Sequence, residues 1–194
     1  MFLPLPTTPE GTPTTPATPA PPPAPPGVGQ SEAFRIRADP NGATYPINVY
    51  LPPSYRSGSG TYPSIYVLDA DARYNNNEPR FQSLRTLLAR SGKEAILVGI
   101  GNTARRDVDY AFPGGRQYHD FLAKQLVPTI ESRYRADPAR RMITGLSLGG
   151  SFVVGALFIE APETLVFQHF LSFDGAFHGD YLAQLKSLDQ QARW

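Results

Sequence analysis

The sequence predicts an α/β fold, with a mostly parallel sheet between helices and an antiparallel hairpin at its N-terminal end. Two observations carry this prediction. Four short apolar runs, each typical of a strand buried on both faces, alternate with segments of helical length. Such alternation implies right-handed crossovers and helices on both faces of the sheet. Before these runs, two strand-like segments flank the turn Pro40-Asn41-Gly42, as in a hairpin.

The expected elements follow the chain in a simple order. The hairpin strands cover residues 34–37 and 44–51, and Pro52-Pro53 ends the second strand. The parallel strands are expected over residues 64–68, 94–100, 141–144 and 167–172. Helices are expected over residues 81–90, 118–134 and 147–160, and a last helical segment over 181–191.

The N-terminal residues differ in composition from the rest of the chain. Eleven of the 21 prolines lie between Pro4 and Pro26, interleaved with Thr and Ala. A tract of this kind has no apolar face to bury. We therefore expect residues 1–31 to be an extended, solvated tether and residues 32–194 to form the folded domain.

Composition and charge exclude several classes of function. A net charge of +1 gives no electrostatic basis for a nucleic-acid partner. No apolar run approaches the roughly 18–20 residues that span a bilayer. Without cysteine, disulfides and thiol nucleophiles are absent. The first residues do not form a signal peptide. The compartment stays open: a cytoplasmic location is the expectation for the chain as written, and a start upstream of Met1 would allow export.

The segment Gly145-Leu146-Ser147-Leu148-Gly149 carries the clearest chemical signal. A serine stands between two glycines, after an apolar run and before a helical segment, which is the G-x-S-x-G pattern in its strand–turn–helix context. The glycines allow strand and helix to approach closely. Ser147 then lies near a helix N-terminus, where free N–H groups favour an oxyanion. The sequence therefore predicts a nucleophilic serine.

Four stretches resemble the putative-esterase branch of the α/β-hydrolase fold, which includes esterase D-like enzymes and siderophore esterases that open trilactones. They are residues 62–71, residues 98–110 with the R-x-x-D-Y segment, residues 121–134, and the elbow at residues 145–152. The resemblance covers roughly residues 33–180. It implies an α/β-hydrolase-like fold and hydrolysis of a carboxylic ester.

The resemblance also assigns roles around Ser147. The oxyanion hole should comprise the backbone N–H of Leu148 and a second N–H from Ala70 or Asp71, with the Asp71 carboxylate turned away. Arg106 should line the substrate pocket and hold an anionic oxygen, or else form a surface ion pair with Asp109. Tyr110 is a candidate aromatic wall of the pocket or a core residue.

The chain departs from the family pattern after Ser147. Only 47 residues follow it, so the last two strands, which usually precede the acid and the histidine of the triad, are expected to be missing. His119 is expected to be solvated, and His169 to be a structural residue in a buried strand. A substitute triad of Ser147, His178 and Asp174 is the remaining hypothesis, because the 172–180 segment leaves the carboxyl end of a strand.

The function most consistent with the residues is ester hydrolysis through an acyl-serine, with a small-molecule ester as the substrate. The alternatives are an inactive truncated copy, a pocket-binding module and acyl transfer to a sugar. Neither a metal nor an organic cofactor is expected. The acidic pair Asp69 and Asp71 fails the calcium-loop pattern, since Arg73, Tyr74 and Arg80 occupy required positions.

A missing outer strand would leave the 167–172 strand as an apolar edge. The 181–191 segment is the candidate to cover it. Without such a cover, we expect the chain to self-associate through this edge.

Overall fold

The computed structural model describes residues 29–73, 77–160, 162–177 and 179–189. Most of the predicted tether, residues 1–28, lies outside the described residues. The first strand begins at Gln30, so the last residues assigned to the tether belong to the sheet.

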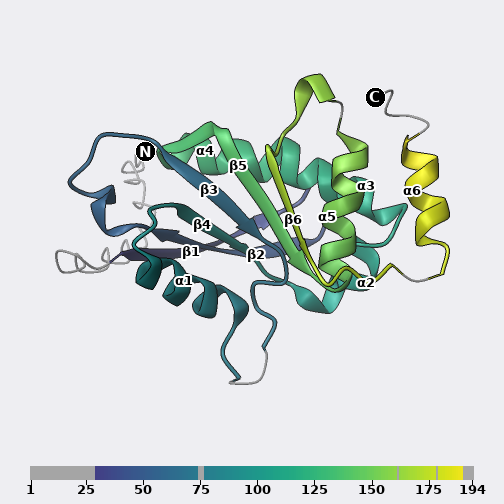
Figure 1. The fold of residues 1–194 in the computed structure, drawn as a ribbon, viewed down its shortest axis with the longest axis horizontal. Helices are drawn as coiled ribbons and strands as arrows, with labels where there is room; N and C mark the ends of the chain where they lie inside the picture. The colour runs from purple at the N-terminus through teal and green to yellow at the C-terminus, as the bar shows by residue number, and fades with distance from the viewer. Residues whose placement is uncertain (1–28, 74–76, 161, 178, 190–194) are drawn as a thin grey trace, which may run out of the picture.

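Six strands form one sheet in the order β1-β2-β4-β3-β5-β6 (Figure 1). They are β1 (Gln30–Arg37), β2 (Thr44–Leu51), β3 (Tyr62–Val67), β4 (Ile96–Ile100), β5 (Ala136–Leu146) and β6 (His169–Phe173). β2 runs antiparallel to both β1 and β4. β4, β3, β5 and β6 all run parallel to one another. The predicted hairpin and parallel sheet are confirmed.

The α-helices of the described residues are α1 (Arg80–Ser91), α2 (Arg106–Asp109), α3 (Gly114–Phe121), α4 (Val127–Arg133), α5 (Leu148–Ile159) and α6 (Tyr181–Asp189). The helix expected over residues 118–134 starts earlier, at Gly114, and passes through a π-helical turn at Leu122–Leu126. The wide turn precedes Pro128, which cannot donate a backbone hydrogen bond within a helix. Within the described residues, no helix has the length and apolar character to cross a membrane.

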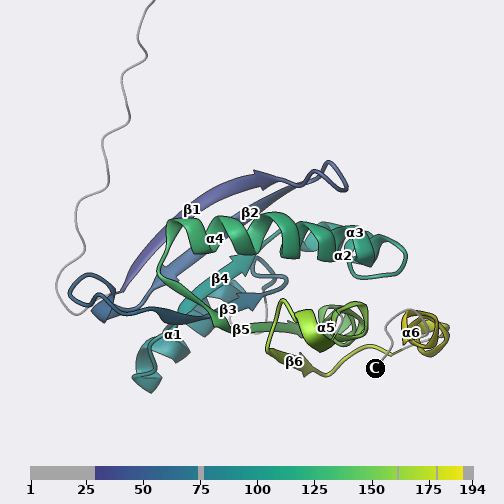
Figure 2. The same cartoon turned by 90° about the horizontal axis from the view of Figure 1, so that it is seen from above.

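Helices cover the two faces of the sheet unequally. α3 and α4 lie over one face and α1 over the other (Figure 2). The larger core forms on the α3–α4 side, where Tyr66, Phe121 and Phe152 are fully buried and α5 contributes. The smaller core lies beneath α1 and includes Phe81 and Leu97. The sheet therefore has helices on both faces, as expected.

The outermost strand β6 differs from its prediction. His169, Leu171 and Phe173 are exposed, whereas the apolar run predicted a strand buried on both faces. β6 pairs only with β5 among the described strands, and α1 packs on β2, β3 and β4, so it leaves the same face of β6 open. α6 lies beside α5, on the side away from β6 (Figures 1 and 2), and therefore does not cover this strand.

Candidate functional site

The turn between β5 and α5 holds Ser147 in a strained backbone conformation. β5 ends at Leu146 and α5 begins at Leu148, so Ser147 alone connects them. Its φ of 57° and ψ of −123° lie outside the regions that non-glycine residues usually occupy. A Cβ at Gly145 would lie 2.4 Å from the carbonyl carbon of Gly149, so the close approach of strand and helix requires glycine there. The strand–turn–helix context of the G-x-S-x-G pattern is present.

The segment that leaves β6 holds the backbone of Ser147 in place. The Ser147 N–H donates to the Phe173 carbonyl at 3.0 Å, and the Ser147 carbonyl accepts from the Ala176 N–H at 3.1 Å. Ser147 is half-buried, and its hydroxyl makes no capping hydrogen bond to α5. The hydroxyl therefore makes no hydrogen bond to the N-terminus of the helix that follows it.

Of the three residues expected to donate to the oxyanion, Leu148 and Asp71 have a backbone N–H that is not already hydrogen-bonded among the described residues. The Ala70 N–H donates to the Ile100 carbonyl at 2.9 Å, and we therefore discard Ala70 as a donor. Leu148 is the first residue of α5, where a backbone N–H has no acceptor within the helix. The Asp71 N–H has no acceptor among the described residues. Leu148 and Asp71 remain as the candidate pair.

The Asp71 carboxylate is directed toward the loop that follows β4. It accepts hydrogen bonds from the Asn102 N–H at 2.9 Å and from the Thr103 N–H at 3.1 Å, and it also contacts the Thr103 hydroxyl. The carboxylate is therefore occupied by these donors. In the part of the chain that the structure describes, no three His, Asp or Glu side chains converge in a way that could hold a metal.

The two further members of the hypothetical triad are only partly described. Asp174 follows β6 directly, has a φ of 43° and is exposed. His178 lies outside the described residues. The substitute triad of Ser147, Asp174 and His178 therefore stays a prediction.

The other two histidines have environments opposite to those expected. His119 is buried, because α3 packs against the end of α5, and its Nε2 lies 2.7 Å from the Glu160 Oε1. His169 is exposed, because the β6 strand that carries it lies at the edge of the sheet. Both expectations were wrong, and among the described residues neither histidine makes a hydrogen bond or ion pair with Ser147.

Arg106 is turned toward the interior beneath the elbow. Its Nη2 lies 3.3 Å from the Asp69 Oδ2 and 3.3 Å from the Leu146 carbonyl oxygen. The surface ion pair considered for Arg106 is formed instead by Arg105, whose Nη2 lies 3.1 Å from the Asp109 Oδ1. The guanidinium of Arg106 therefore connects the end of β5 with the loop after β3.

Tyr110 belongs to the core. It is 3% exposed, and its ring lies 5.4 Å from the ring of Tyr118 and 5.5 Å from that of Phe152. Its hydroxyl accepts a hydrogen bond from the Asp69 N–H at 3.2 Å. The prediction that Tyr110 contacts substrate is therefore replaced by its alternative, a core residue that supports the loop after β3.

Asp69 is a candidate that sequence reasoning considered only as a calcium ligand. Its side chain is completely buried, and neither carboxylate oxygen accepts a hydrogen bond from a described residue. Burial raises the pKa of Asp69, while the nearby Arg106 and Arg80 oppose this effect. One signal could have found it: an acidic residue directly follows the apolar run of a parallel strand, at the edge where ligands bind.

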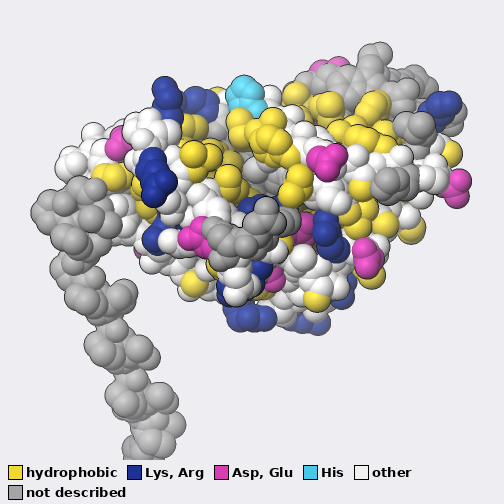
Figure 3. Space-filling model, turned by 60° about the horizontal axis from the view of Figure 1, so that its bottom comes forward, with side chains coloured by type: hydrophobic (Ala, Val, Ile, Leu, Met, Phe, Trp, Pro, Cys, Tyr) yellow, Lys and Arg dark blue, Asp and Glu magenta, His cyan; other side chains and the backbone are white. Residues whose placement is uncertain are grey.

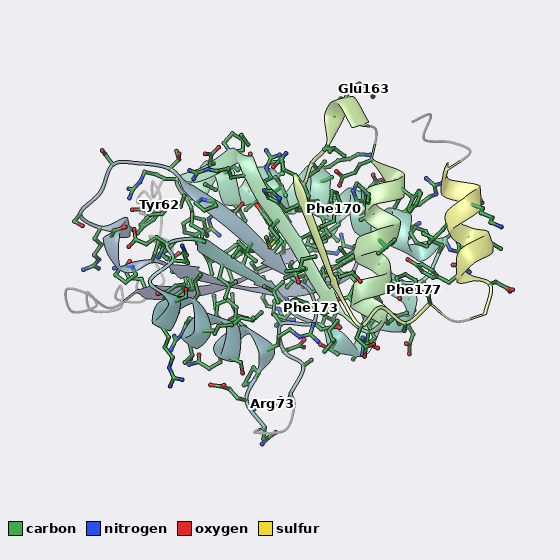
Figure 4. The ribbon with its side chains drawn as sticks, in the orientation of Figure 1. Tyr62, Arg73, Glu163, Phe170, Phe173 and Phe177 are labelled. Atoms are coloured by element: carbon green, nitrogen blue, oxygen red, sulfur yellow. The ribbon has the colours of Figure 1, made fainter. Side chains whose placement is uncertain are left out.

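A hydrophobic groove of about 710 Å³ opens between α1 and the ends of β5 and β6. Its lining includes Leu84, Leu88, Met142, Leu146, Leu171 and Phe173. Hydrophobic side chains gather on the face that Figure 3 shows, and Figure 4 labels Phe173 near the end of β6. Leu146, which directly precedes Ser147, lines the groove, whereas Ser147 itself is not among the lining residues.

Comparisons with known proteins relate this geometry to one family. The profile of the family described as "Putative esterase" matches residues 41–178. The uncharacterized protein YbbA of Bacillus subtilis is 32% identical over 121 residues, which cover 53% of this chain and 46% of YbbA. Ferri-bacillibactin esterase BesA, from the same organism, is 28% identical over 174 residues, covering 75% of this chain and 58% of BesA.

Among solved structures, an IroE-like serine hydrolase from Shewanella oneidensis is similar, with a TM-score of 0.68 and 25% sequence identity. The similarity covers 83% of this chain and 56% of that structure. The chain spans about half the length of the two curated relatives.

Proposed function

Because the chain belongs to the Putative esterase family, we propose that it is a serine hydrolase that cleaves a carboxylic ester through an acyl-serine intermediate. The observation that carries this proposal is the strained Ser147 between β5 and α5. Backbone strain of this kind persists only where the surrounding structure imposes it, and it clusters at functional sites. The half-buried position of Ser147, whose hydroxyl makes no capping hydrogen bond, supports the role of nucleophile.

The proposed reaction has two steps. The Ser147 Oγ attacks the carbonyl carbon of the ester while its proton passes to a base. The carbonyl oxygen becomes negatively charged, and the N–H groups of Leu148 and Asp71 donate hydrogen bonds to it. The bond to the alcohol then breaks, and the alcohol leaves with a proton. Water attacks the acyl-serine in the same way, which releases the acid and regenerates Ser147.

For the base we propose His178, oriented by Asp174. This proposal is supported by the backbone hydrogen bonds that hold the 173–176 segment against Ser147, since they bring the start of this segment next to the nucleophile. A serine hydroxyl without a hydrogen-bonded base is a poor nucleophile. The replacement His178→Ala tests the assignment, with exposed His169→Ala as the matched control. Unchanged ester turnover in the His178 variant would exclude the substitute triad.

For the substrate we propose an ester with an apolar or aryl acyl part. The hydrophobic groove beside the elbow supports this choice. The name of BesA, a ferri-bacillibactin esterase, makes siderophore esters a reasonable class to compare. Turnover should be measured on aryl esters, on short aliphatic esters and on a catecholate trilactone, and preference for the short aliphatic esters would contradict the proposal.

A fluorophosphonate probe tests the function without knowledge of the substrate. We expect labelling of the intact chain and of Ser132→Ala, an exposed serine on α4, but not of Ser147→Ala. Mass spectrometry of the labelled peptide locates the adduct. A folded chain that does not react at all would overturn the proposal and favour an inactive copy or a binding module.

A further inference from the structure

The two candidate oxyanion donors belong to segments that are far apart in the sequence. Asp71 lies in the loop after β3, and Leu148 begins the helix after β5. An oxyanion hole stabilises charge only if its donors are held 2.7–3.1 Å from the oxygen, a spacing set in advance by the protein. Some contact must therefore fix the loop after β3 relative to the elbow.

One guanidinium contacts both segments. The Arg106 Nη2 lies 3.3 Å from the Asp69 carboxylate and 3.3 Å from the Leu146 carbonyl oxygen. Asp69 stands two residues before Asp71, and Leu146 stands two residues before Leu148. Arg106 comes from α2, in the connection after β4, so it acts as a bridge from a third segment.

The loop that carries Asp71 is fixed around Asp69. The Asp69 N–H donates to the Tyr110 hydroxyl, and the Ala70 N–H donates to the Ile100 carbonyl. These bonds hold the backbone on both sides of the Asp69 side chain, and the Asn102 and Thr103 N–H groups hold the Asp71 carboxylate. The contact of Arg106 with Asp69 therefore acts on a loop with little remaining freedom, at a point two residues before the Asp71 N–H.

The charge of Asp69 also requires compensation. Its completely buried carboxylate lies near the start of α5, since a Cβ added to Gly149 would lie 3.4 Å from its Oδ2. A buried negative charge at this position opposes the negative charge that develops on the ester oxygen. Arg106 at 3.3 Å, with Arg80 at 3.9 Å, neutralises it.

We infer that Arg106 is a positioning residue that, together with Asp69, sets the distance between the Asp71 and Leu148 N–H groups and neutralises the buried Asp69 carboxylate. This inference rests on the proposed function, because it assigns the two N–H groups to an oxyanion hole. It differs from the expected role of Arg106 as a substrate clamp, because the guanidinium end is bonded within the protein.

The test compares the rate constant of fluorophosphonate labelling in Arg106→Met, Arg106→Lys, Asp69→Asn and the double variant Asp69→Asn/Arg106→Met. We expect Arg106→Met to lower the rate about 100-fold or more, the size of effect typical of a damaged oxyanion hole. Arg106→Lys should restore the rate only in part, because both contacts come from the Nη2 and the lysine ammonium lies closer to its own backbone than that atom does. The double variant should react at least about tenfold faster than Arg106→Met, because it also removes the buried carboxylate, which in Arg106→Met has lost its nearer cation and keeps only the more distant contact with Arg80.

Arg90→Met, at an exposed position on α1, is the matched control and should label like the unchanged chain. A labelling rate of Arg106→Met equal to that of the unchanged chain would overturn the inference. A double variant that labels more slowly than Arg106→Met would also overturn the inference. In that case the two substitutions would lower the labelling rate independently, as expected if both side chains had a purely structural role.

Amide NMR separates this inference from the proposed function. In Arg106→Met the signals of the Asp71 and Leu148 N–H groups should shift, and in Arg90→Met they should stay in place. If the unchanged chain does not react with the probe, the hydrolase proposal fails, yet the amide shifts still decide whether Arg106 positions these two groups. Unshifted signals in Arg106→Met would overturn the inference.

Discussion

The Nε2 of His119 lies 2.7 Å from the Oε1 of Glu160, and this buried pair joins α3 to the residue that ends α5. The second oxygen of Glu160 accepts the Val166 N–H at 2.7 Å, which also fixes the start of the segment leading to β6. The helix that follows Ser147 is therefore anchored at its far end.

His119→Ala should destabilise the protein by about 3 kcal/mol, because it leaves the buried Glu160 without one of its partners. Urea unfolding measures the loss. His169→Ala, at an exposed position, should change stability by no more than about 0.5 kcal/mol. Equal effects of the two substitutions would contradict this interpretation of the buried pair.

The two glycines of the elbow should respond differently to alanine. At Gly145 the new Cβ would lie 2.4 Å from the backbone of Gly149, so Gly145→Ala should cost at least about 3 kcal/mol or prevent folding. At Gly149 the nearest atom would lie 3.4 Å away, an ordinary contact, and Gly149→Ala should stay within about 1 kcal/mol of the unchanged chain. Thermal unfolding compares the two, and a reversed order would show that the elbow is not packed as described.

Alkaline pH should weaken the fold through Tyr45. Burial and the hydrogen bond to Asp109 raise its pKa to about 12, against about 10 in the unfolded chain. Between these values the folded state keeps a proton that the unfolded state releases. The stability that this tyrosine contributes is therefore complete below pH 10 and is lost as the pH rises toward 12.

The variant Tyr45→Phe isolates this contribution. At pH 8 it should be less stable by about 1 kcal/mol, because Asp109 loses a hydrogen bond. The difference should shrink between pH 9.5 and pH 11, because phenylalanine does not ionise. Urea unfolding at several pH values provides the measurement, and a difference that stays constant would disagree with the raised pKa.

The exposed edge at β6 should cause self-association. Phe173 is 52% exposed and Leu171 is 39% exposed, and the outer side of β6 pairs with no described strand. Light scattering at tens of micromolar should detect dimers or larger species, and Phe173→Lys should reduce them. Val108→Lys, at an exposed apolar position on α2, should not. A monodisperse monomer of the unchanged chain would rule out association through this edge.

Local patterns in the sequence were sufficient for much of the fold and for the elbow. The bounds of β2, residues 44–51, agree with the predicted strand, and the turn at Ser147 follows from the glycines and the apolar run around it. Turn chemistry and hydrophobic periodicity depend on neighbours along the chain, and a sequence displays those neighbours directly.

Only the tertiary structure decided which groups are free and which are occupied. The Ala70 N–H is bonded to Ile100, Arg106 is paired with Asp69, and His119 is buried against Glu160. The apolar run of β6 resembles that of a central strand, yet its exposure depends on whether another element covers it. Each of these facts depends on partners that are distant in the sequence, and a pattern of successive residues does not record which distant partner the fold brings near.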